Sequence, residues 1–211
     1  NQVFTHCPVI PHPELSRNLF SQIIRMVFVY SQLFLFHSPT AFRFLQLEKK
    51  DNVSFRARWK NLFINNRILK EKLDWLHFGF ATMTLRRENV ARAIDARMGV
   101  SLRGYDICIY PLKQPGCYER LWDKVDKVHS ISDDLLLAAQ KQGLTDDTPQ
   151  ITIHPAIDID SFNTRGKNWK KLNSKETIRF LTIARLHWKK GLEYTLEALS
   201  ILKENNFLFR Y

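Results

Sequence analysis

A cluster of cationic residues follows a strand-like apolar run near the end of the sequence. The run covers residues 178–184, and Arg185, Lys189 and Lys190 come shortly after it. Gly191 then opens an amphipathic segment with helical spacing. This order brings three sources of positive potential to one position. They are the side-chain cations, the free N–H groups of the first helical turn and the positive end of the helix dipole. The segment therefore predicts an anion site, and the anion that it suits is a phosphate or diphosphate.

Further polar residues lie where the sequence predicts the carboxyl ends of three other strands. Ligands of parallel α/β sheets bind at these ends, and a glycine there lets the backbone turn sharply or approach a ligand. The candidates are His77 and Gly79 after the first strand, Arg103, Gly104 and Asp106 after the second, and Ser132 after the third.

Each of these polar side chains also has a structural interpretation. A lone histidine at a strand end, such as His77, is more often structural than functional. Arg103 and Asp106 would form an ion pair that holds their loop. Ser132 is a good N-cap residue for the helix that follows, and for this serine the structural interpretation is favoured.

The elements that must position these residues begin with three predicted helices. Apolar residues recur every three or four positions over residues 14–36, which predicts the first helix. Ser38 and Pro39 resemble an N-cap followed by a proline in the first turn, so a second helix is expected to reach about Lys50. A third helix is predicted over about residues 54–72.

From residue 73 onward, short apolar runs alternate with helical segments, which predicts βαβ units and a parallel sheet. The expected strands are 2–5, 73–77, 98–102, 127–131, 150–154, 178–184 and 207–211. The expected helices are 83–96, 119–124, 132–142 and 191–203, with a long loop after residue 102. We therefore predict an α/β protein. A Rossmann-like parallel-sheet domain would cover residues 1–160, a linker 161–176, and the first strand–helix unit of a second Rossmann-like domain 177–211.

The positive charge is concentrated in the three predicted helices. The formal net charge of the chain is +11, and residues 17–72 hold eleven Lys and Arg against three acidic residues. Such a block suits nucleic acid, an anionic membrane surface or a solvated helical face. The apolar stretch 23–36 is too short to cross a bilayer and contains Arg25 and Gln32, so we expect a core helix or a helix at a membrane surface.

Several classes of site have no support in the sequence. The three cysteines form no CxxC and no histidine lies at ligand spacing, so neither a disulfide framework nor a metal site is expected. Reduced thiols in the cytosol are the favoured interpretation. The chain contains no GxGxxG, no GxxxxGK[ST], no GxSxG and no HExxH. We therefore expect no bound cofactor.

Five segments, in order over residues 73–192, resemble motifs of the GT-B glycosyltransferases, in particular the retaining enzymes of family 4. Arg185-Leu-His-Trp-Lys-Lys-Gly191 is similar to the R-L-x-x-x-K-G segment of that family. Leu76-His77-Phe78-Gly79 resembles the first His-containing loop of the family, and Ser101-Leu-Arg-Gly-Tyr-Asp106 resembles its H-G-x-D segment. Ser130-Ile-Ser132 resembles the segment with the serine before a helix. His154-Pro-Ala-Ile-Asp158, together with Phe162, resembles the N-G-V-D-x-x-x-F segment.

The resemblance implies two Rossmann-like domains that face each other across a cleft. The N-terminal domain would bind a glycan or lipid-linked acceptor, and the C-terminal domain a nucleotide-diphosphate sugar. A hexose would be transferred with retention and without a metal, in cell-surface polysaccharide synthesis. The protein would be cytoplasmic, with the basic block on the inner membrane face. The implied roles are catalysis by His77, Arg103 and Asp106, donor diphosphate binding by Arg185, Lys190 and Gly191, and cleft-loop positions at Gly79, Gly104 and Ser132.

Three departures from the family pattern limit what the resemblance implies. Arg103 stands where many members have histidine, and Ala156 and Ala184 stand where glycine is usual. The E-x7-E segment that contacts the donor sugar would lie beyond Tyr211, and the opening strand before Asn1. We therefore expect a fragment that lacks most of the C-terminal domain and does not turn over.

Two other functions stay open. One is a degenerate domain that serves protein–protein contact. The other is a nucleic-acid-binding module that uses the basic block, and it is less favoured because no aromatic-interleaved groove or known motif accompanies the charges.

Overall fold

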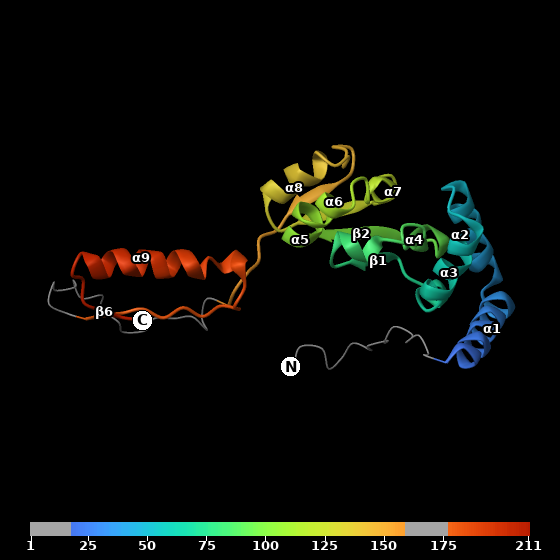
Figure 1. Ribbon diagram of the computed structural model, residues 1–211. Helices are drawn as coiled ribbons and strands as arrows, with labels where there is room; N and C mark the ends of the chain where they lie inside the picture. Colours follow the sequence, from blue (N-terminus) through green and yellow to red (C-terminus); the bar gives the residue numbers. More distant parts are fainter. Residues whose placement is uncertain (1–17, 159–176) are drawn as a thin grey trace. The chain divides into compact units, whose positions relative to one another are not determined.

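The computed structural model describes residues 18–158 and 177–211 (Figure 1). The chain divides into two compact units, an N-terminal unit of residues 1–156 and a C-terminal unit of residues 157–211, and each is described by itself. The strand predicted at residues 2–5 and the linker predicted at 161–176 lie outside the described residues.

Three helices open the N-terminal unit, as the sequence predicted. They are α1 (Leu19–Phe36), α2 (Ser38–Lys50) and α3 (Phe55–Asn65). The third helix is shorter than predicted, because a separate 3-10 helix, η1 (Ile68–Lys70), follows it.

The caps of these helices explain where they begin. The Asn18 side chain accepts a hydrogen bond from the Phe20 backbone N–H, and Ser54 accepts one from Ala57, so both satisfy an N–H group that the first turn leaves without an intrahelical partner. The predicted N-cap at Ser38 is wrong. His37 occupies that position without a side-chain cap, and the helix begins one residue earlier because proline fits its first turn.

Apolar side chains from the three helices form a core of their own that extends to the sheet. Leu33 of α1, Phe44 of α2 and Leu62 of α3 are fully buried. Val90 of α4 (Val90–Ala93) belongs to the same core, so the helices are joined to the element before the second strand. Burial of each such side chain contributes roughly 1.5–3 kcal/mol.

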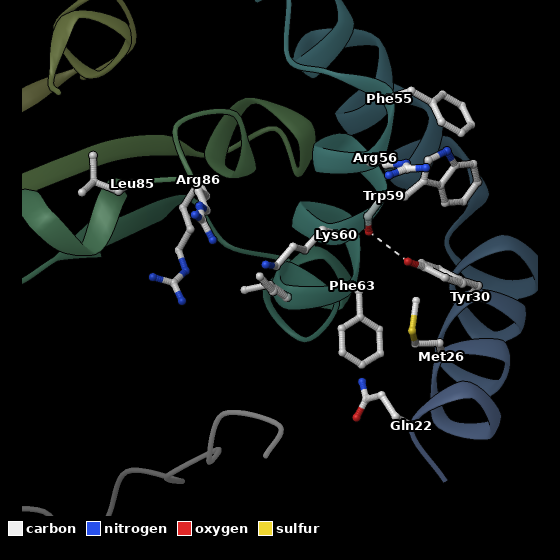
Figure 2. Close-up of a pocket in the computed structure, with 12 residues that line it drawn as sticks. Gln22, Met26, Tyr30, Phe55, Arg56, Trp59, Lys60, Phe63, Leu85 and Arg86 are labelled. Atoms are coloured by element: carbon white, nitrogen blue, oxygen red, sulfur yellow. Dashed lines mark hydrogen bonds between the residues drawn. The ribbon is translucent and has the colours of Figure 1, made fainter. Parts of the chain in front are cut away.

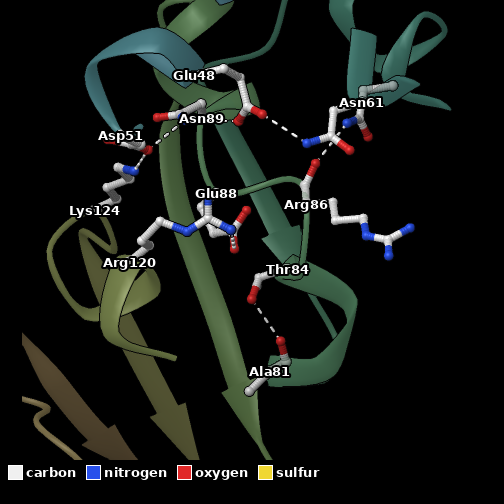
Figure 3. Close-up of polar contacts among 11 residues, drawn as sticks. Glu48, Asp51, Asn61, Ala81, Thr84, Arg86, Glu88, Asn89, Arg120 and Lys124 are labelled. Atoms are coloured by element: carbon white, nitrogen blue, oxygen red, sulfur yellow. Dashed lines mark hydrogen bonds and ion pairs between the residues drawn. The ribbon is translucent and has the colours of Figure 1, made fainter. Parts of the chain in front are cut away.

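Polar side chains reinforce this junction at the amino-terminal side of the sheet (Figure 3). The fully buried Glu48 accepts hydrogen bonds from the amides of Asn61 and Asn89 at 2.7 and 2.9 Å. Asp51 forms an ion pair with Lys124. Because buried charges need partners, these contacts hold the helices and the sheet in one arrangement.

The sheet of the N-terminal unit is parallel and has the order β1-β2-β3-β4. Its strands are β1 (Trp75–Phe78), β2 (Arg97–Leu102), β3 (Lys127–Ser130) and β4 (Gln150–Thr152). The predicted parallel α/β sheet is therefore confirmed, and it is consistent with a Rossmann-like fold.

Alternate residues of the strands face the main core. Met98, Val100 and Leu102 of β2 are fully buried there. They pack with residues of the helices that cover this face, α5 (Gly104–Cys108), α7 (Glu119–Trp122) and α8 (Asp133–Gln140) (Figure 1). Because side chains alternate along a strand, Gly99 and Ser101 of β2 must lie on the opposite face of the sheet.

Two connections differ from prediction. The helix expected over 83–96 is instead a 3-10 helix, η2 (Ala81–Thr84), a turn, and the short α4. Arg86 and Asp95 have φ angles of 66° and 65°, which a continuous right-handed helix does not allow. The loop expected after residue 102 contains two short helices, α5 and α6 (Tyr110–Lys113).

The C-terminal unit contains one strand–helix–strand sequence. Its elements are β5 (Ile178–Arg179), the 3-10 helix η4 (Trp188–Lys190), α9 (Leu192–Glu204) and β6 (Phe209–Arg210). β5 and β6 pair in parallel, as the sequence predicted. The strand predicted over 178–184 is wrong in length, since β5 ends at Arg179.

Within the two described stretches, no helix combines the length and the apolar character that a bilayer crossing requires.

Candidate functional site

The loops that follow β1 and β2 are tied together by one carboxylate. Asp106 accepts hydrogen bonds from the backbone N–H groups of Ala81 and Arg103 at 2.8 and 2.9 Å. Arg103 Nε donates to the carbonyl oxygen of Gly79 at 3.2 Å. The structure therefore brings together the predicted site residues Gly79, Arg103, Gly104 and Asp106 at the carboxyl ends of two neighbouring strands.

Asp106 holds this site but does not open onto it. Its side chain is fully buried, and each of its two oxygens accepts from a backbone donor. Burial raises the pKa of the Asp106 carboxyl, while the N–H groups of Ala81 and Arg103 act in the opposite direction. Both oxygens are occupied, so Asp106 is suited to positioning the loops.

Arg103 presents the charge of this site. Its guanidinium lies over the ring of Phe80, 5.1 Å from the ring centroid, and the residue is exposed. The ion pair that we expected with Asp106 is not present in the described stretches, because Asp106 binds the Arg103 backbone instead. The arginine therefore keeps donors directed to solvent beside Gly79.

His77 belongs to a second network, which crosses the sheet on the face opposite the main core. His77 Nε2 lies 2.9 Å from Ser101 Oγ, and the same oxygen lies 2.9 Å from His129 Nδ1. His129 Nε2 lies 3.2 Å from the carbonyl oxygen of Ile153. A carbonyl can only accept, so His129 carries its proton on Nε2. Ser101 then donates to His129, and His77 donates to Ser101.

The strand register explains why these three side chains meet. Ser101 pairs with His129, and His77 pairs with Gly99, so all lie on one face of neighbouring strands. Gly99 makes room for the imidazole, because a Cβ atom there would lie 3.0 Å from His77 Nδ1. Sequence reasoning selected His77 and missed Ser101 and His129. The available signal was that both are polar residues close to the expected strand ends, Ser101 one residue and His129 two residues before them.

The electrostatics of this network favour a neutral imidazole. Partial burial lowers the pKa of His77, and the neighbouring His129 lowers it further. At neutral pH the His77 ring is therefore a hydrogen-bond donor at Nε2 and an acceptor at Nδ1, which suits it to accept a proton.

Ser132 has the structural role that was favoured for it. Its hydroxyl accepts a hydrogen bond from Leu135 N at 3.4 Å and so caps α8, while its carbonyl accepts from Ser130 at 2.7 Å.

The predicted anion-binding residues Arg185, Lys190 and Gly191 belong to the C-terminal unit. Arg185 and Lys190 are exposed. Gly191 has a φ angle of 59° and joins η4 to α9, so it makes a turn that a side chain would strain. The cations thus lie in the turn directly before a helix of 13 residues, as the sequence predicted.

The cap of the 3-10 helix η4, which precedes α9, was not predicted. His187 Nδ1 accepts a hydrogen bond from Lys189 N at 3.2 Å, so a histidine caps the short 3-10 turn before the helix.

Among the described residues, no group of three or more His, Cys, Asp or Glu side chains is arranged to hold a metal ion.

Comparison of the chain with protein-family models, with curated proteins and with solved structures finds no match.

Proposed function

We propose that the protein is a retaining hexosyltransferase. The activity is the transfer of a hexose from a nucleotide-diphosphate sugar to a glycan or a lipid-linked acceptor, in cell-surface polysaccharide synthesis, and for the 211-residue chain itself the proposal concerns recognition of the donor. The observation that carries the proposal is the polar edge of the parallel sheet, where Asp106 fixes Arg103 beside Gly79. Ligands of parallel α/β sheets bind at such an edge. The resemblance of Arg185 to Gly191 to the donor-binding segment supports the same activity.

In this proposal the two units have different tasks. Arg185 and Lys190 bind the donor diphosphate and stabilise the negative charge that develops on it as the glycosidic bond breaks. Arg103 lies near the reacting sugar, Asp106 positions its loop, and the neutral His77 accepts a hydrogen bond or a proton.

The helices of the N-terminal unit support a place at the membrane surface. One face of α1 exposes large apolar side chains, Phe20, Ile23, Ile24, Val27 and Phe28. Residues 17–72 carry the excess of positive charge that anionic lipids attract. We propose that this face contacts the inner leaflet, near the acceptor.

Titration calorimetry with UDP, GDP and ADP tests donor recognition by the 211-residue chain. We expect one of these nucleotides to bind, and the double variant Arg185→Ala, Lys190→Ala to bind at least about tenfold more weakly. The control Lys49→Ala, Lys50→Ala removes two charges from α2 and should bind normally. Failure of all three nucleotides, or unchanged binding by the first variant, would contradict the proposal.

A second function, a domain for protein–protein contact, is favoured by the face of the sheet opposite the main core. Trp75 of β1 is 45% exposed, and Ile151 and Ile153 at β4 are 41% and 55% exposed. Parallel sheets are normally covered on both faces, so these side chains suit a partner surface. A chain that binds no nucleotide but self-associates in sedimentation velocity, with Trp75→Ser reversing the association, would support this function.

A further inference from the structure

An apolar groove runs between α1, α3 and the turn at residues 85–87 (Figure 2). Its volume is about 860 Å³, which is within the range of ligand sites. Met26 and Tyr30 of α1 line it, with Trp59 and Phe63 of α3 and Leu85 of the turn. The groove is therefore large enough for a hydrocarbon chain.

The Tyr30 hydroxyl is engaged by the backbone of α3. The Tyr30 hydroxyl donates to the carbonyl oxygen of Trp59 at 2.9 Å, and the two rings meet edge to face at 5.4 Å. Tyr30 also contacts the Phe63 ring, at 6.2 Å between centroids. These contacts fix the position of Tyr30 in the lining of the groove, and its hydroxyl is already hydrogen-bonded.

The groove adjoins a second, polar pocket of about 620 Å³. Arg56, Lys60 and Arg86 line both. The polar pocket also contains Ser54, the N-cap of α3, so the positive end of the dipole of an 11-residue helix faces it. An apolar space thus passes directly into a cationic one.

The three shared cations have no acidic partner within the described stretches. One acid, Asp51, also lines the polar pocket, but its carboxylate is engaged by Lys124 and by the Asn89 amide. The first turn of α3 contains no acidic residue. All three cations line both pockets, and like charges that share a pocket repel, so an anion bound there would reduce that repulsion.

The backbone at Arg86 supports a binding role. Its φ angle of 66° is unfavourable for a residue with a side chain, and such strain persists where the surrounding structure enforces it, often at binding sites. Here Asn65 enforces it, because its amide donates to the Arg86 carbonyl at 2.9 Å. Asn65 also accepts from Arg87 Nε at 3.2 Å. Arg87 therefore anchors the turn, and Arg86 presents its charge to the groove.

We propose that this groove binds a phosphate-bearing membrane lipid. One hydrocarbon chain lies between α1 and α3, and the phosphate lies among Arg56, Lys60 and Arg86. Ile23 and Val27 are exposed on α1 next to the groove-lining Met26, so the apolar face of α1 gives the chain a continuous path from a bilayer. The inference rests on the helices of the N-terminal unit and does not depend on sugar transfer.

Three soluble probes test the ligand class with the 211-residue chain. They are a lysophosphatidic acid below its micelle concentration, a monoacylglycerol with the same acyl chain, and inorganic phosphate, all followed by titration calorimetry. We expect the lysophosphatidic acid to bind at least about tenfold more tightly than either of the others. Equal affinity for monoacylglycerol would overturn the role of the cations, and equal affinity for phosphate would overturn the role of the groove.

Variants locate the site. Lys60→Gln with Arg86→Gln keeps a polar side chain at both positions but removes both charges, and should weaken lysophosphatidic acid binding at least about tenfold. Met26→Trp fills the groove and should have a similar effect. The control Lys49→Gln with Lys50→Gln removes the same charge from α2 and should bind like the parent. Circular dichroism confirms that each variant is folded. A folded variant of either groove type that binds like the control would overturn the proposal, whatever the outcome of the nucleotide titrations.

Discussion

The hydrogen bonds through Ser101 give two histidines distinct roles. His129 is fixed by the carbonyl of Ile153, and it in turn sets the direction of the serine proton and of the His77 proton. A single backbone carbonyl thus determines which nitrogen of His77 is free to accept. Resonance assignment of the two rings by NMR reads this tautomer directly.

The lowered pKa of His77 makes stability depend on pH. Its pKa in the folded protein is below the ordinary value of about 6.5, so the unfolded chain takes up the proton first as pH falls. The free energy of unfolding should therefore decrease from about pH 6.5 down to the folded-state pKa, and this contribution should then level off. Since His129 contributes to the shift, His129→Asn should move the His77 pKa upward. An NMR titration midpoint for His77 at or above that of an unfolded peptide would contradict this expectation.

Removal of the Asp106 carboxylate should destabilise the protein. Asp106→Ala leaves the N–H groups of Ala81 and Arg103 without their acceptor, and a buried donor without a partner costs about 1–3 kcal/mol. We expect urea unfolding to show a loss of about 2–4 kcal/mol. The exposed Asp134 offers a matched control, and a loss in Asp106→Ala no larger than in Asp134→Ala would show that Asp106 does not hold the loops.

At the scale of the elements, strand β2 determines the shape of the sheet face opposite the main core. Each strand gives alternate residues to the two faces, so Met98 and Val100 face the main core while Gly99 and Ser101 face the histidines. Gly99 leaves room for the imidazole of His77, and Ser101 binds it through a hydrogen bond.

A methyl group in β2 should therefore displace His77. Gly99→Ala places a Cβ atom 3.0 Å from His77 Nδ1, while Gly79→Ala meets nothing within 4 Å. Overpacking costs about 1–3 kcal/mol, and we expect the lower end because the exposed ring can move. NMR should show that His77 loses its contact with Ser101 in Gly99→Ala and keeps it in Gly79→Ala. The same His77 spectrum in both variants would be the contrary result.

The order and type of the elements could be predicted where apolar periodicity was strong. The helix over 38–50 and the strands of the parallel sheet have that property, and both were found. The prediction of a helix over 83–96 was wrong because two residues in it, Arg86 and Asp95, have positive φ angles. The apolar spacing does not reveal these angles, and an arginine gives no sign of one by its residue type. The strand predicted over 178–184 was too long, because an apolar run alone does not show whether a neighbouring strand is present to pair with it.

The candidate site was predictable only in part, for a related reason. Glycines and charges after strands identified the edge where Gly79, Arg103 and Asp106 meet. The hydrogen bonds between His77, Ser101 and His129 depend on register across strands, which spacing along the chain does not give.

At the scale of the whole chain, the junction of helices and sheet connects the proposed lipid groove with the sheet edge. Both belong to the N-terminal unit, and Glu48 of α2 binds Asn61 of α3 and Asn89 before α4. The same carboxylate thus connects a helix of the groove with the segment that leads into β2.

Loss of this carboxylate should loosen the helices more than the sheet. Glu48→Ala leaves two buried amides without their acceptor and should lower the free energy of unfolding by about 2–4 kcal/mol. Hydrogen exchange should increase throughout α2 and α3 and less in β2, whose ladder stays paired. Glu71→Ala, at an exposed position, is the control. Uniform exchange in the Glu48 variant, or exchange equal to that of the control, would show that the junction does not couple these elements.

The sheet order has a consequence for synthesis on the ribosome. The strands lie in space in the order in which they occur in the chain, from β1 to β4, and each pairs with the one made before it. Among the strands β1 to β4 of the described residues, none has to be inserted between two others that have already paired. Because folding during translation proceeds from the N-terminus, each emerging strand can add to an edge that is already available. The sheet can therefore grow vectorially, with its newest strand always at the margin.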